Sequence, residues 1–471
     1  MRPRMSFDDV AWEKSDEISD VWKKTLFKED TLRAVGRFIA KHHMGVPVEL
    51  SGPTAGAFNA VFKMRFKNGD SAILRIPFPG VVMFPEEKVR DEIAVMRYLN
   101  ANTSIPVPMI LHWGTKEESP CNLGPFIIME YIEHAFNVTA ALRTPGYNRQ
   151  DRPVLDPDIS PDKLDSVYGQ IADILLQLSG PSFSRIGSLT ETEEDTFEAT
   201  NRPHTFNMND IVQLGTYPRS QLPATAFESS SAYYNALADT HLNHLYYQRN
   251  DAVDDEIDCR RKYVARHLFR KLARDERLTS ENYKRGPFKL WCDDLRPSNI
   301  PLNDELRIVG VIDWEFTYAA PVEFTHSPPW WLLLEQPEYW PGGLNEWTEA
   351  YEPRLQTFLT PLRRCEQDRI SSGSLRPEDT LSEHMERSWL TGDFWVSYAA
   401  RKSFAFDSVF WIKIDRRFFA EKHDEEMAPV EKRLLLLGQE EKKGIDAFVK
   451  RKMEQMKVKE LAWEPDEVVD T

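Results

Sequence analysis

The segment around Asn68-Gly69 constrains the fold of this chain most strongly. Two runs in which apolar and polar residues alternate, 61–66 and 71–76, stand on either side of it. Asn and Gly both tolerate positive φ, so an Asn-Gly pair between two alternating runs predicts an antiparallel β-hairpin. The fold should therefore contain an antiparallel sheet.

The register of this hairpin decides which side chains share a face of the sheet. A two-residue Asn-Gly turn would place Phe62 opposite Arg75 and Lys63 opposite Leu74. Directly opposed residues share a face, and neighbours along a strand alternate between faces. Arg75 and Lys63 are therefore expected on opposite faces.

Helices are expected before and after the hairpin. Pro85, the two acidic residues that follow it and an apolar stripe at helical spacing predict a helix that carries Glu92. The apolar run at 125–132 predicts a buried strand that leads into a linker. Apolar side chains also recur at helical spacing in residues 7–43, which are expected to be helical, and in residues 162–179, which predict another amphipathic helix.

The second half of the chain is expected to be mainly helical. A polar, proline-dotted stretch at 190–225 leads into a predicted helix pair at about 226–275, and the region 190–285 has the character of an insertion. Residues 286–320 predict two short strands around a loop. Several helices are expected between 380 and 460, and the last of them is strongly charged.

The composition narrows the classes of function. Hydrophobic residues make up 41% and aromatic residues 11% of the chain, which suits an ordered globular enzyme. The formal net charge of -16 argues against broad nucleic-acid binding, because neutralising phosphates needs a basic face. No apolar run approaches the length needed to span a bilayer, so neither nucleic acid nor membrane is an expected partner.

The sequence also carries hints about location. The opening MRPRMSFDDVAWEKSDE has no apolar core and has early acidic residues, so it fits neither a secretory signal nor a transit peptide. The cysteines show no CxxC pairing, which argues against a zinc site and a disulfide framework. We therefore expect a reducing, cytoplasmic location. The four cysteines are Cys121, Cys259, Cys292 and Cys365.

One stretch carries residues suited to phosphoryl transfer. Asp294 and Asn299 stand five apart in the turn-rich segment WCDDLRPSNI (291–300), and Asp313 ends an apolar run, predicted to be a strand, in LRIVGVIDWE (306–315). Phosphoryl transfer needs a carboxylate for the proton of the attacking hydroxyl and hard oxygen ligands for Mg²⁺. Singly, each residue would more simply stabilise a turn or end a strand. In this order and spacing, the three predict a phosphotransferase loop.

These segments resemble a known family. CDDLRPSN and VIDWEF are similar to the H-x-D-L-x-P-x-N and I-D-[WF]-[DE] motifs of aminoglycoside phosphotransferase-like kinases, which include choline and methylthioribose kinases, and they look closest to a large fungal branch. The resemblance implies an α+β, two-lobed protein-kinase-like fold with a small antiparallel-sheet lobe and a large, mostly helical lobe. It also implies ATP or another nucleoside triphosphate, Mg²⁺, and a small-molecule acceptor that offers a hydroxyl group.

The resemblance further implies a division of the chain. Residues 1–44 would form an N-terminal helical extension, 45–132 the small lobe and 133–471 the helical lobe. The helical lobe would contain the catalytic loop at 291–315, the insertion described above and a C-terminal helical extension at about 380–471.

The family motifs assign roles around the catalytic loop. Asp294 resembles the catalytic base, and Asn299 and Asp313 resemble the metal ligands. Glu315 occupies the second acidic place of the D-x-[DE] pattern, where it would assist the metal or would be a solvated carboxylate at a strand end. Arg296 would neutralise the transferring phosphoryl group, or would form an ordinary ion pair.

The same resemblance assigns a nucleotide site to the small lobe. The loop SGPTAGAFNA (51–60) is not a clean G-x-G-x-x-G, but its glycines let the backbone approach phosphates. Arg75 would pair with Glu92, seventeen residues on, and the segment 126–132 would be the hinge between the lobes. The residues expected to bind the nucleotide are Gly52, Gly56, Phe58, Asn59, Arg75, Glu92, Glu130 and Ile132.

Departures from the family pattern leave rival functions open. Cys292 stands where the family has a mainly architectural His, and Arg75 stands where it has a phosphate-binding Lys; Lys63 is a minor candidate to replace that Lys. Arg keeps the charge, but its planar fork is not a compact ammonium. With the irregular glycine loop, these changes also fit a non-catalytic, pseudokinase-like nucleotide-binding or scaffold protein.

Two other rivals are weaker. A protein kinase would be expected to show D-F-G and A-P-E signatures, and neither is visible. A catalytic thiol at Cys292 would need a His/Asn partner pattern that is not visible nearby.

Aromatic residues cluster after the catalytic loop. Trp330, Trp331 and Trp340 follow a Ser-Pro-Pro segment and are candidates for the wall of an acceptor pocket, although structural core aromatics are more common. A second group falls at helical spacing and favours a place in the core. It consists of Trp389, Phe394, Trp395 and Tyr398.

Overall fold

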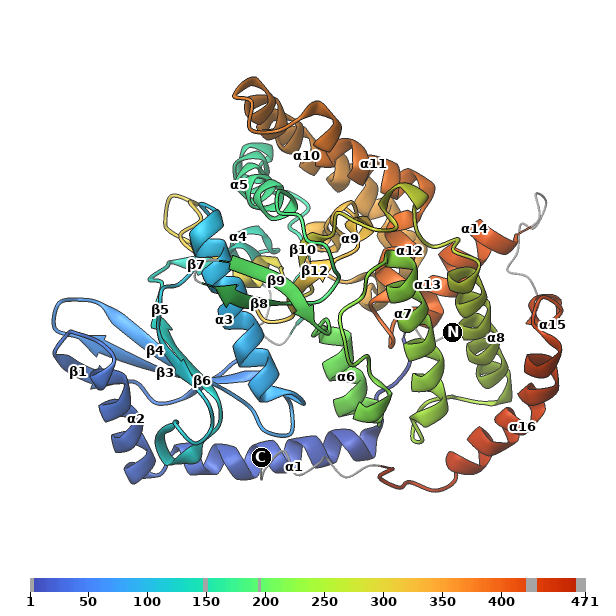
Figure 1. The fold of residues 1–471 in the computed structure, drawn as a ribbon, viewed down its shortest axis with the longest axis horizontal. Helices are drawn as coiled ribbons and strands as arrows, with labels where there is room; N and C mark the ends of the chain where they lie inside the picture. The colour runs from blue at the N-terminus through green and yellow to red at the C-terminus, as the bar shows by residue number, and fades with distance from the viewer. Residues whose placement is uncertain (1–3, 147–150, 194–195, 421–429, 463–471) are drawn as a thin grey trace.

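The chain folds into two lobes of different composition. The computed structural model describes residues 4–146, 151–193, 196–420 and 430–462. A sheet with two helices against it makes up the small lobe, and helices dominate the large lobe (Figure 1). The expected α+β, two-lobed protein-kinase-like fold is therefore confirmed.

The small lobe is built on a six-stranded antiparallel sheet in the order β1-β3-β4-β6-β5, with β2 beside β3. One face packs through Phe62 and Leu74 against the helix α2 (Glu29–Lys41), and the other places Ile127 and Met129 against the helix α3 (Pro85–Asn102). The strands are β1 (Pro47–Leu50), β2 (Thr54–Ala55), β3 (Asn59–Phe66), β4 (Ser71–Pro77), β5 (Ile110–Gly114) and β6 (Phe126–Glu130).

The predicted hairpin forms between β3 and β4, but its loop is one residue longer than expected. The backbone N–H of Phe66 donates to the carbonyl of Asp70 at 2.9 Å, so three residues make the turn. Gly69 takes a φ of 96°. This left-handed conformation at the end of the loop is typical of three-residue hairpins, and it sets the register.

The longer loop moves the strand register by one residue. Arg75 lies opposite Val61, and Lys63 lies opposite Ile73. These four side chains share one face, because directly opposed residues do so and the side-chain period along a strand is two. The prediction that Arg75 and Lys63 lie on opposite faces is therefore wrong.

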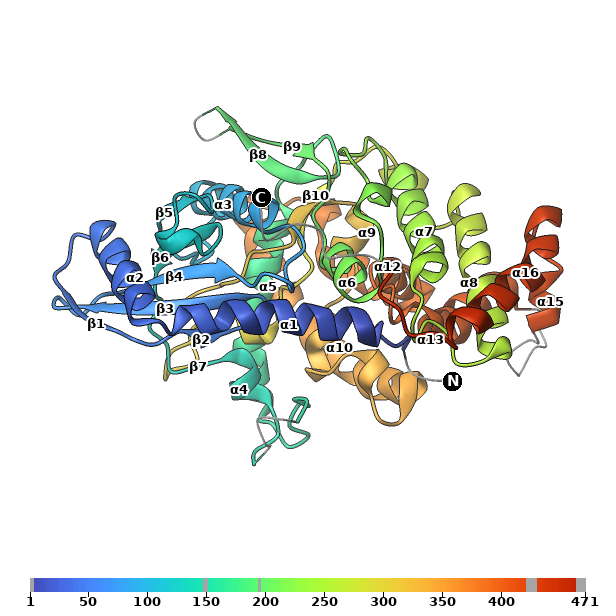
Figure 2. The same ribbon diagram turned by 90° about the horizontal axis from the view of Figure 1, so that it is seen from below.

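The helical structure predicted for residues 7–43 is confirmed, and it consists of two helices. They are α1 (Asp9–Leu26) and α2 (Glu29–Lys41), and the backbone between them is extended at Lys28. Two acidic residues in the first turn of α2 favour a new helix start there. The break lets α2 turn onto the sheet while α1 runs along both lobes (Figure 2).

Polar contacts of α1 join the two lobes. The indole N–H of Trp22 donates to the carbonyl of Leu123 in the small lobe at 2.9 Å. Towards the other end of the helix, the hydroxyl of Ser15 accepts a 2.8 Å hydrogen bond from the side-chain amide of Gln213 in the large lobe. The N-terminal helix is thus bonded to each lobe.

The helices predicted after Pro85 and at 162–179 are confirmed. They are α3 (Pro85–Asn102), which carries Glu92, and α5 (Pro161–Ser179). Pro occupies the first turn of both helices, where its missing N–H has no partner to lose. The predicted buried strand at 125–132 is confirmed as β6.

The predicted helix pair after residue 226 is confirmed as α7 (Ser230–Tyr247) and α8 (Glu256–Arg274), which pack together. The polar stretch before it was not expected to hold regular structure. It contains a hairpin, β8 (Ser188–Glu193) with β9 (Thr196–Asn201), and the helix α6 (Phe206–Leu214). Most residues of the hairpin are exposed or half-buried, so its sequence lacks a strong apolar alternation.

Helices also dominate the C-terminal part, as predicted. The charged last helix buries Ile445, Phe448 and Val449 and packs against α8. Residues 421–429 and 463–471 of the expected extension lie outside the described residues. The helices are α10 (Gly343–Ser371), α11 (Leu381–Thr391), α12 (Asp393–Ala400), α13 (Phe406–Val409), a π-helical turn (Phe410–Ile414), α14 (Asp415–Phe419), α15 (Val430–Leu434) and α16 (Gln439–Gln455).

Short elements frame the predicted catalytic loop. The strand β10 (Lys289–Cys292) pairs antiparallel with β12 (Thr317–Ala320). The predicted strand at 306–313 is wrong: the segment forms one isolated bridge, between Leu302 and Ile308. The N–H groups of Val311 and Ile312 donate to the carbonyls of Pro106 and Asn299, which lie in two other loops. The remaining elements nearby are β7 (Phe136–Asn137), β11 (Pro301–Leu302), α4 (Val138–Leu142) and α9 (Val322–Thr325).

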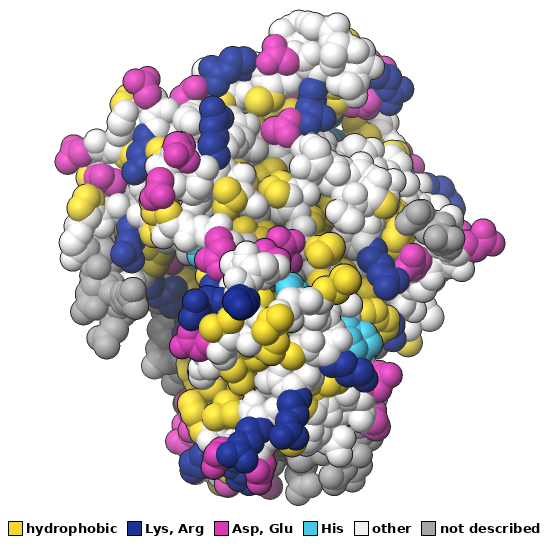
Figure 3. Space-filling model, turned by 90° about the vertical axis from the view of Figure 1, so that its left-hand side faces the viewer, with side chains coloured by type: hydrophobic (Ala, Val, Ile, Leu, Met, Phe, Trp, Pro, Cys, Tyr) yellow, Lys and Arg dark blue, Asp and Glu magenta, His cyan; other side chains and the backbone are white. Residues whose placement is uncertain are grey.

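The surface of the small lobe mixes both signs of charge. Figure 3 shows Lys and Arg side chains interspersed with Asp and Glu over the face that this lobe presents. Among the described residues, no helix combines the length and the apolar character needed to cross a bilayer.

Candidate functional site

The loop after β10 brings Asp294 and Asn299 together. A single helical turn, Pro297–Asn299, folds the chain back on itself. The side-chain amide of Asn299 then donates to the backbone carbonyl of Asp294 at 2.9 Å and to its carboxylate at 3.2 Å. The guanidinium of Arg296 forms an ion pair with the other oxygen of that carboxylate at 3.0 Å. The amide oxygen of Asn299 accepts from Ser298 at 3.1 Å.

Burial sets the acidity of Asp294, whose exposed fraction is 7%. Burial raises the pKa of this carboxyl to about 7; Arg296 opposes the rise, and the nearby Glu315 and Asp313 add to it. A carboxylate with a pKa near neutrality suits a general base, because a large fraction of it is ionised near neutral pH and it is still basic enough to accept a proton.

The segment that carries Asp313 closes onto the same point. The N–H of Ile312 donates to the carbonyl of Asn299 at 3.0 Å, which ties the two loops together. Asp313 has a φ of 59° and Phe316 has a φ of 60°. Asp tolerates this left-handed conformation, but for a bulky residue such as Phe it is strained. The N–H of Asp293 donates to the carbonyl of Phe316 at 3.1 Å and helps to hold it.

Arg75 reaches this loop from the sheet. Its guanidinium donates to the carboxylate of Asp313 at 2.6 Å and also forms an ion pair with Glu92 of α3. Arg75 is 6% exposed and Glu92 is 1% exposed. Although burial acts to lower it, Glu92, Glu315 and Asp313 together raise the pKa of Arg75. The predicted pairing of Arg75 with Glu92 is therefore present.

A second buried cation, Lys88, was missed in the sequence. Its ammonium forms an ion pair with Glu315 and donates to the side-chain oxygen of Asn59 at 3.0 Å. The amide of Asn59 in turn donates to Glu315 at 3.1 Å. Lys88 stands four residues before Glu92 on α3, so both share one helical face, and this spacing is the signal that would have pointed to it.

The carboxylate of Glu315 is thus already engaged. Burial alone would raise its pKa, but Lys88 and then Arg75 hold the pKa below its ordinary range. One of its oxygens forms ion pairs with Lys88 and, at 3.8 Å, with Arg75, and the same oxygen accepts the hydrogen bond from Asn59. It is 2% exposed, so it is not a solvated carboxylate at a strand end.

Lys63 does not enter this cluster, although it shares a face with Arg75. Its ammonium pairs with Glu133 at 2.8 Å and lies 3.4 Å from the ring centroid of Tyr131. Both partners follow the last residue of β6. Lys63 therefore does not take the place of Arg75, and Lys88 is the second cation beside Glu92.

The predicted nucleotide loop connects the strands β1 to β3. A Cβ on Gly52 would meet nothing within 4 Å, so the backbone there is open to a ligand. The N–H of Gly56 donates to the carbonyl of Asn59 at 2.9 Å. Phe58 is buried against Phe206 and Phe316, with ring centroids at 5.3 and 5.4 Å. Its side chain is therefore an anchor for the loop.

The predicted hinge lies where β6 ends. Glu130 is exposed, and its N–H donates to the carbonyl of Met109 at 2.9 Å. Ile132 packs onto Gly310 of the large lobe so closely that a Cβ there would lie 2.4 Å from the end of the Ile132 side chain. Glycine at 310 thus permits the close approach of the two lobes at the hinge.

A cavity of about 330 Å³ opens beside the predicted catalytic loop. Its lining includes Phe58, Asp294 and Arg296, together with Asp210 of α6 and Lys402. Burial raises the pKa of Asp210 to about 7, with Lys402 opposing and Asp294 adding to the rise. Sequence reasoning missed Asp210 and Lys402, because neither belongs to a motif and both reach the cavity only through the fold.

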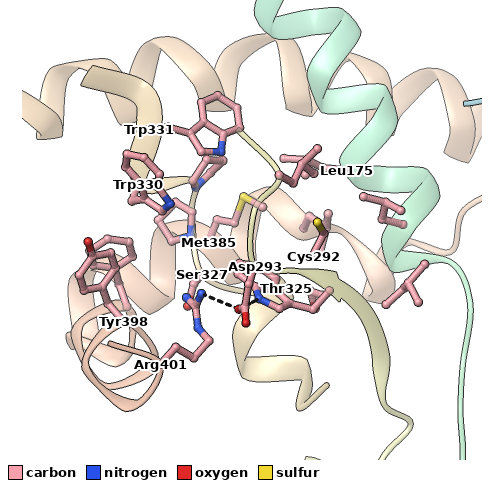
Figure 4. A pocket seen from close by; sticks show the side chains of 18 residues that line it. Leu175, Cys292, Asp293, Thr325, Ser327, Trp330, Trp331, Met385, Tyr398 and Arg401 are labelled. Atoms are coloured by element: carbon pink, nitrogen blue, oxygen red, sulfur yellow. Dashed lines mark hydrogen bonds and ion pairs between the residues drawn. The ribbon is translucent and has the colours of Figure 1, made fainter. Parts of the chain in front are cut away.

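A smaller cavity of about 50 Å³ adjoins the first (Figure 4). Trp330 lines both cavities, Trp331 lines only the smaller one, and Trp340 lines neither. The candidate wall residues therefore separate into two that line a cavity and one that does not. The second aromatic group is packed as predicted: Phe394, Trp395 and Tyr398 are buried, and Trp389 packs against the same core.

Cys292 also lines the smaller cavity (Figure 4). It is buried, its thiol donates to the carbonyl of Glu315 at 3.7 Å, and burial raises its pKa. A thiol held in its neutral form is a poor nucleophile, so the environment of Cys292 favours the architectural role.

The oxygen atoms present suit Mg²⁺ bound together with a nucleotide. Among the described residues, no three His, Cys, Asp or Glu side chains are grouped to hold a metal by themselves. Mg²⁺ in phosphotransferases is usually bound by one or two protein oxygens together with substrate phosphates. The carboxylate of Asp313, 32% exposed, and the amide oxygen of Asn299 fit that donor set.

Two groups of known proteins resemble this chain. Residues 49–324 match the APH phosphotransferase enzyme family, over more than half of the chain. A subtelomeric hrmA-associated cluster protein of Aspergillus fumigatus is 29% identical over 139 residues, which cover 30% of this chain and 24% of that protein. Altered inheritance of mitochondria protein 9, mitochondrial, of Yarrowia lipolytica is 21% identical over 368 residues, 70% of this chain and 59% of that protein. The chain thus spans less than two thirds of the length of these relatives.

Solved structures resemble it more distantly. A thermostable mutant of aminoglycoside phosphotransferase APH(4)-Ia, in a ternary complex with AMP-PNP and hygromycin B, is 14% identical with a TM-score of 0.41, covering 82% of this chain and 99% of that one. Amicoumacin kinase hAmiN, in complex with AMP-PNP and Ca²⁺, is 12% identical with a TM-score of 0.41, covering 92% and 95%. On the extent of the family match, the chain belongs to the APH phosphotransferase enzyme family.

Proposed function

We propose that the protein transfers the γ-phosphoryl group of ATP, or of another nucleoside triphosphate, to a hydroxyl group of a small molecule. One observation carries this proposal. Asp294, a buried carboxylate whose pKa is raised to about 7, forms part of the wall of a 330 Å³ cavity and is bonded to Asn299, whose backbone is tied to the loop of Asp313. This arrangement supports the proposal, because a candidate base, a cavity for an acceptor and candidate oxygen donors for a metal lie in adjoining segments.

In this reaction Asp294 orients the acceptor hydroxyl and accepts its proton. The acceptor oxygen forms a bond to the γ-phosphorus while the bond from that phosphorus to the β,γ-bridging oxygen breaks, and the nucleoside diphosphate leaves. Arg296, paired with Asp294 and lining the same cavity, lies where it would offset the charge on the transferring group.

The nucleotide would lie between the sheet and the catalytic loop. The open backbone at Gly52 and the nearby backbone at Gly56 would approach the phosphates. Arg75 would contact them while keeping its pairing with Glu92. Glu130 and Ile132 stand at the hinge, where the base of the nucleotide is expected.

Asn299 and Asp313 would hold the magnesium ion. When bound, the ion supplies charge stabilisation at the phosphate oxygens. Glu315 is better described as a positioning residue, because its carboxylate already receives Lys88 and Asn59. Its pairs connect α3 and the end of the nucleotide loop to the Asp313 segment.

A screen with labelled ATP tests the proposal. The full chain is incubated with Mg²⁺, γ-labelled ATP and a panel of small hydroxyl compounds, beside the Asp294→Asn variant. We expect a labelled phosphoester from the wild type and at least about 10²-fold less from the variant. Equal labelling by both proteins would remove the role given to Asp294.

The rival functions give different results. A pseudokinase-like scaffold is favoured by the hydrogen bond that Arg75 makes to Asp313, the proposed metal ligand, and it predicts no stabilisation by Mg·ATP in a thermal-shift series. A protein kinase would label generic protein substrates more efficiently than small alcohols. Either result would overturn the substrate class proposed here.

We also propose a cytoplasmic location. The support is the reducing character inferred from the scattered cysteines, none of which is paired among the described residues. The alternative is a mitochondrial location, which the names of some relatives indicate for those proteins. Fractionation of cells that express the tagged protein decides between the two, and enrichment in mitochondria would reject the cytoplasmic proposal.

A further inference from the structure

The two cavities beside the catalytic loop share part of their walls. Asp293, Trp330 and Arg401 line both the cavity of about 330 Å³ that holds Asp294 and the smaller one of about 50 Å³. Asp293 directly precedes Asp294 in the chain. A molecule whose hydroxyl lies at Asp294 would therefore lie near the junction between the cavities, which the adjacent residue Asp293 lines.

The smaller cavity is apolar in character. Figure 4 shows Trp330 and Trp331 on one side of it and Leu175 of α5 on the other, with Met385 of α11 close by. Its further apolar lining comes from segments far apart in the sequence. These residues are Leu178, Leu290, Leu295, Pro328, Leu381 and Phe394.

The junction itself is polar and well supported. The guanidinium of Arg401 lies 3.6 Å from the carboxylate of Asp293, beyond hydrogen-bonding distance. Arg401 is held over the ring of Trp291, 4.3 Å from its centroid, and donates to the carbonyl of Ser397 at 3.1 Å. Asp293 accepts from the indole of Trp291 at 2.8 Å and from the N–H of Phe206 at 3.2 Å. Both charged groups are therefore fixed by other contacts.

Building on the proposed function, we propose that the smaller cavity is a subsite for a short aliphatic group of the acceptor. The acceptor would place its hydroxyl at Asp294, a polar atom at the junction beside Arg401, and an apolar end against Met385. Ligand sites are characteristically apolar pockets with a few fixed polar groups, and the two cavities together have that composition.

The volume limits the size of the apolar group. A site needs about 10–15 Å³ of such space for one water-sized group, so about 50 Å³ accommodates roughly three to five carbon atoms. The substrate class is therefore a small alcohol with a propyl- to pentyl-sized substituent. Neither a bare polyol nor a long acyl chain fits this description.

Binding of simple alcohols tests the subsite directly. Saturation-transfer NMR of the full chain with 1-alkanols from ethanol to octanol measures occupancy without any need to know the natural acceptor. We expect the signal to rise with chain length to a maximum between propanol and pentanol, and to fall for heptanol and octanol. A signal that rises monotonically to octanol, or one that is flat, would overturn the proposal.

Two variants and a control sharpen this test. Leu175→Phe fills the cavity and should abolish the maximum, whereas Met385→Ala enlarges it and should move the maximum to longer alkanols. Met96→Ala is the matched control, because Met96 is buried to the same 2% exposure as Met385 but lines neither cavity. A shift in Met96→Ala equal to that in Met385→Ala would reject the assignment to this cavity.

A phosphoryl-transfer assay provides a second test of the subsite. Labelled ATP is supplied with 1-O-alkylglycerols and alkyl glucosides, each from methyl to octyl. Within a series that is phosphorylated, kcat/KM should rise about fourfold for each added methylene up to the length found by NMR. Equal rates for the methyl and butyl members would overturn the inference.

The two proposals fail separately. If Mg·ATP does not stabilise the wild type while the alkanol maximum is present, the phosphotransferase proposal falls and the apolar cavity remains a binding site. If Mg·ATP stabilises both the wild type and Leu175→Phe equally but no alkanol maximum exists, the subsite falls and the proposed reaction stands.

Discussion

The guanidinium of Arg75 donates a 2.6 Å hydrogen bond to the carboxylate of Asp313, across the gap between the sheet and the catalytic loop. Arg75 is buried and keeps a second pairing with Glu92, whereas Asp313 is partly exposed. The arginine fork has enough donors for both partners, so it can release Asp313 without losing Glu92. In the proposed complex, the metal ion would take the place of Arg75 at the carboxylate of Asp313. A phosphate group would take the place of Asp313 at the guanidinium of Arg75.

The first prediction concerns the metal. Asp313→Asn should raise the Mg²⁺ concentration needed for half-maximal stabilisation by ATP by at least about tenfold, because a ligand charge is lost. Glu315→Gln should change this concentration much less, since Glu315 is engaged by Lys88 and Asn59. Thermal-shift titrations of Mg²⁺ at fixed ATP measure both. If the Mg²⁺ concentration rose equally in the two variants, Glu315 would have to be counted as a metal ligand.

The second prediction concerns the Lys88–Glu315 ion pair. Lys88→Met leaves a carboxylate buried without its main partner and should destabilise the protein by about 3–5 kcal/mol. The double variant Lys88→Met/Glu315→Leu should recover most of that loss, because it removes both charges. Urea denaturation measures the free energies of unfolding.

A matched control for this pair is Lys67→Met. Lys67 is exposed in the hairpin loop, so its replacement should change the stability by no more than about 0.5 kcal/mol. A double variant as unstable as Lys88→Met alone would contradict the pairing argument.

The third prediction isolates the proposed base. Asp294→Asn should lower kcat by about 10²- to 10⁴-fold while leaving the stabilisation by Mg·ATP within a few-fold of the wild type. Asp304→Asn, an exposed position in the following loop, serves as the control and should behave as the wild type. Steady-state kinetics with the acceptor found by the labelling screen measure the effect. A comparable loss in both variants would point to unfolding rather than to chemistry.

The fourth prediction is a pH profile. Burial raises the pKa of Asp294 to about 7, so the carboxyl is protonated below that pH and cannot accept a proton. The value of kcat/KM should therefore fall about tenfold for each pH unit below 7 and level off above it. Bound magnesium would move the inflection to lower pH, because a cation favours the charged carboxylate. An inflection near pH 4 would show that burial does not control this group.

The fifth prediction tests the hinge. Gly310→Ala should push Ile132 aside, because the added Cβ would lie 2.4 Å from the end of that side chain. We expect a loss of stability of about 1–2 kcal/mol and a weaker response to ATP. Adding Ile132→Val removes the clashing atom and should restore both. Differential scanning fluorimetry with and without Mg·ATP reads the two effects, and a double variant without recovery would reject the contact.

Several elements of the fold and part of the candidate site were predictable from local patterns. The Asn68-Gly69 turn, the helix after Pro85 and the loop of Asp294 and Asn299 each depend on neighbours in the chain, and all three form. The segment from Asp294 to Asn299 is rich in turn-forming residues, which favour folding of the chain back on itself. The contact between the two side chains was therefore predictable.

Features set by distant partners were not predictable. The spacing of Lys88 and Glu92 on α3 is a local signal, but the contact of Lys88 with Glu315 arises only because the segment of Glu315 folds against that helix. The hairpin register depends on a single residue, Gly69, which takes the left-handed conformation at the end of a three-residue loop. The apolar run that ends at Asp313 reads as a strand, yet its backbone bonds to two separate loops.

The packing of Phe58 against Phe206 and Phe316 has a consequence for the timing of the reaction cycle. Three rings, from the nucleotide loop, from α6 and from the segment after Asp313, share one buried contact. Raising the nucleotide loop by a rigid motion would expose Phe58 to water. In the proposed reaction, release of the nucleoside diphosphate should therefore be slow and steeply temperature-dependent. Phe58→Ala should increase the rate of release, because it removes the ring that holds the loop in this buried contact.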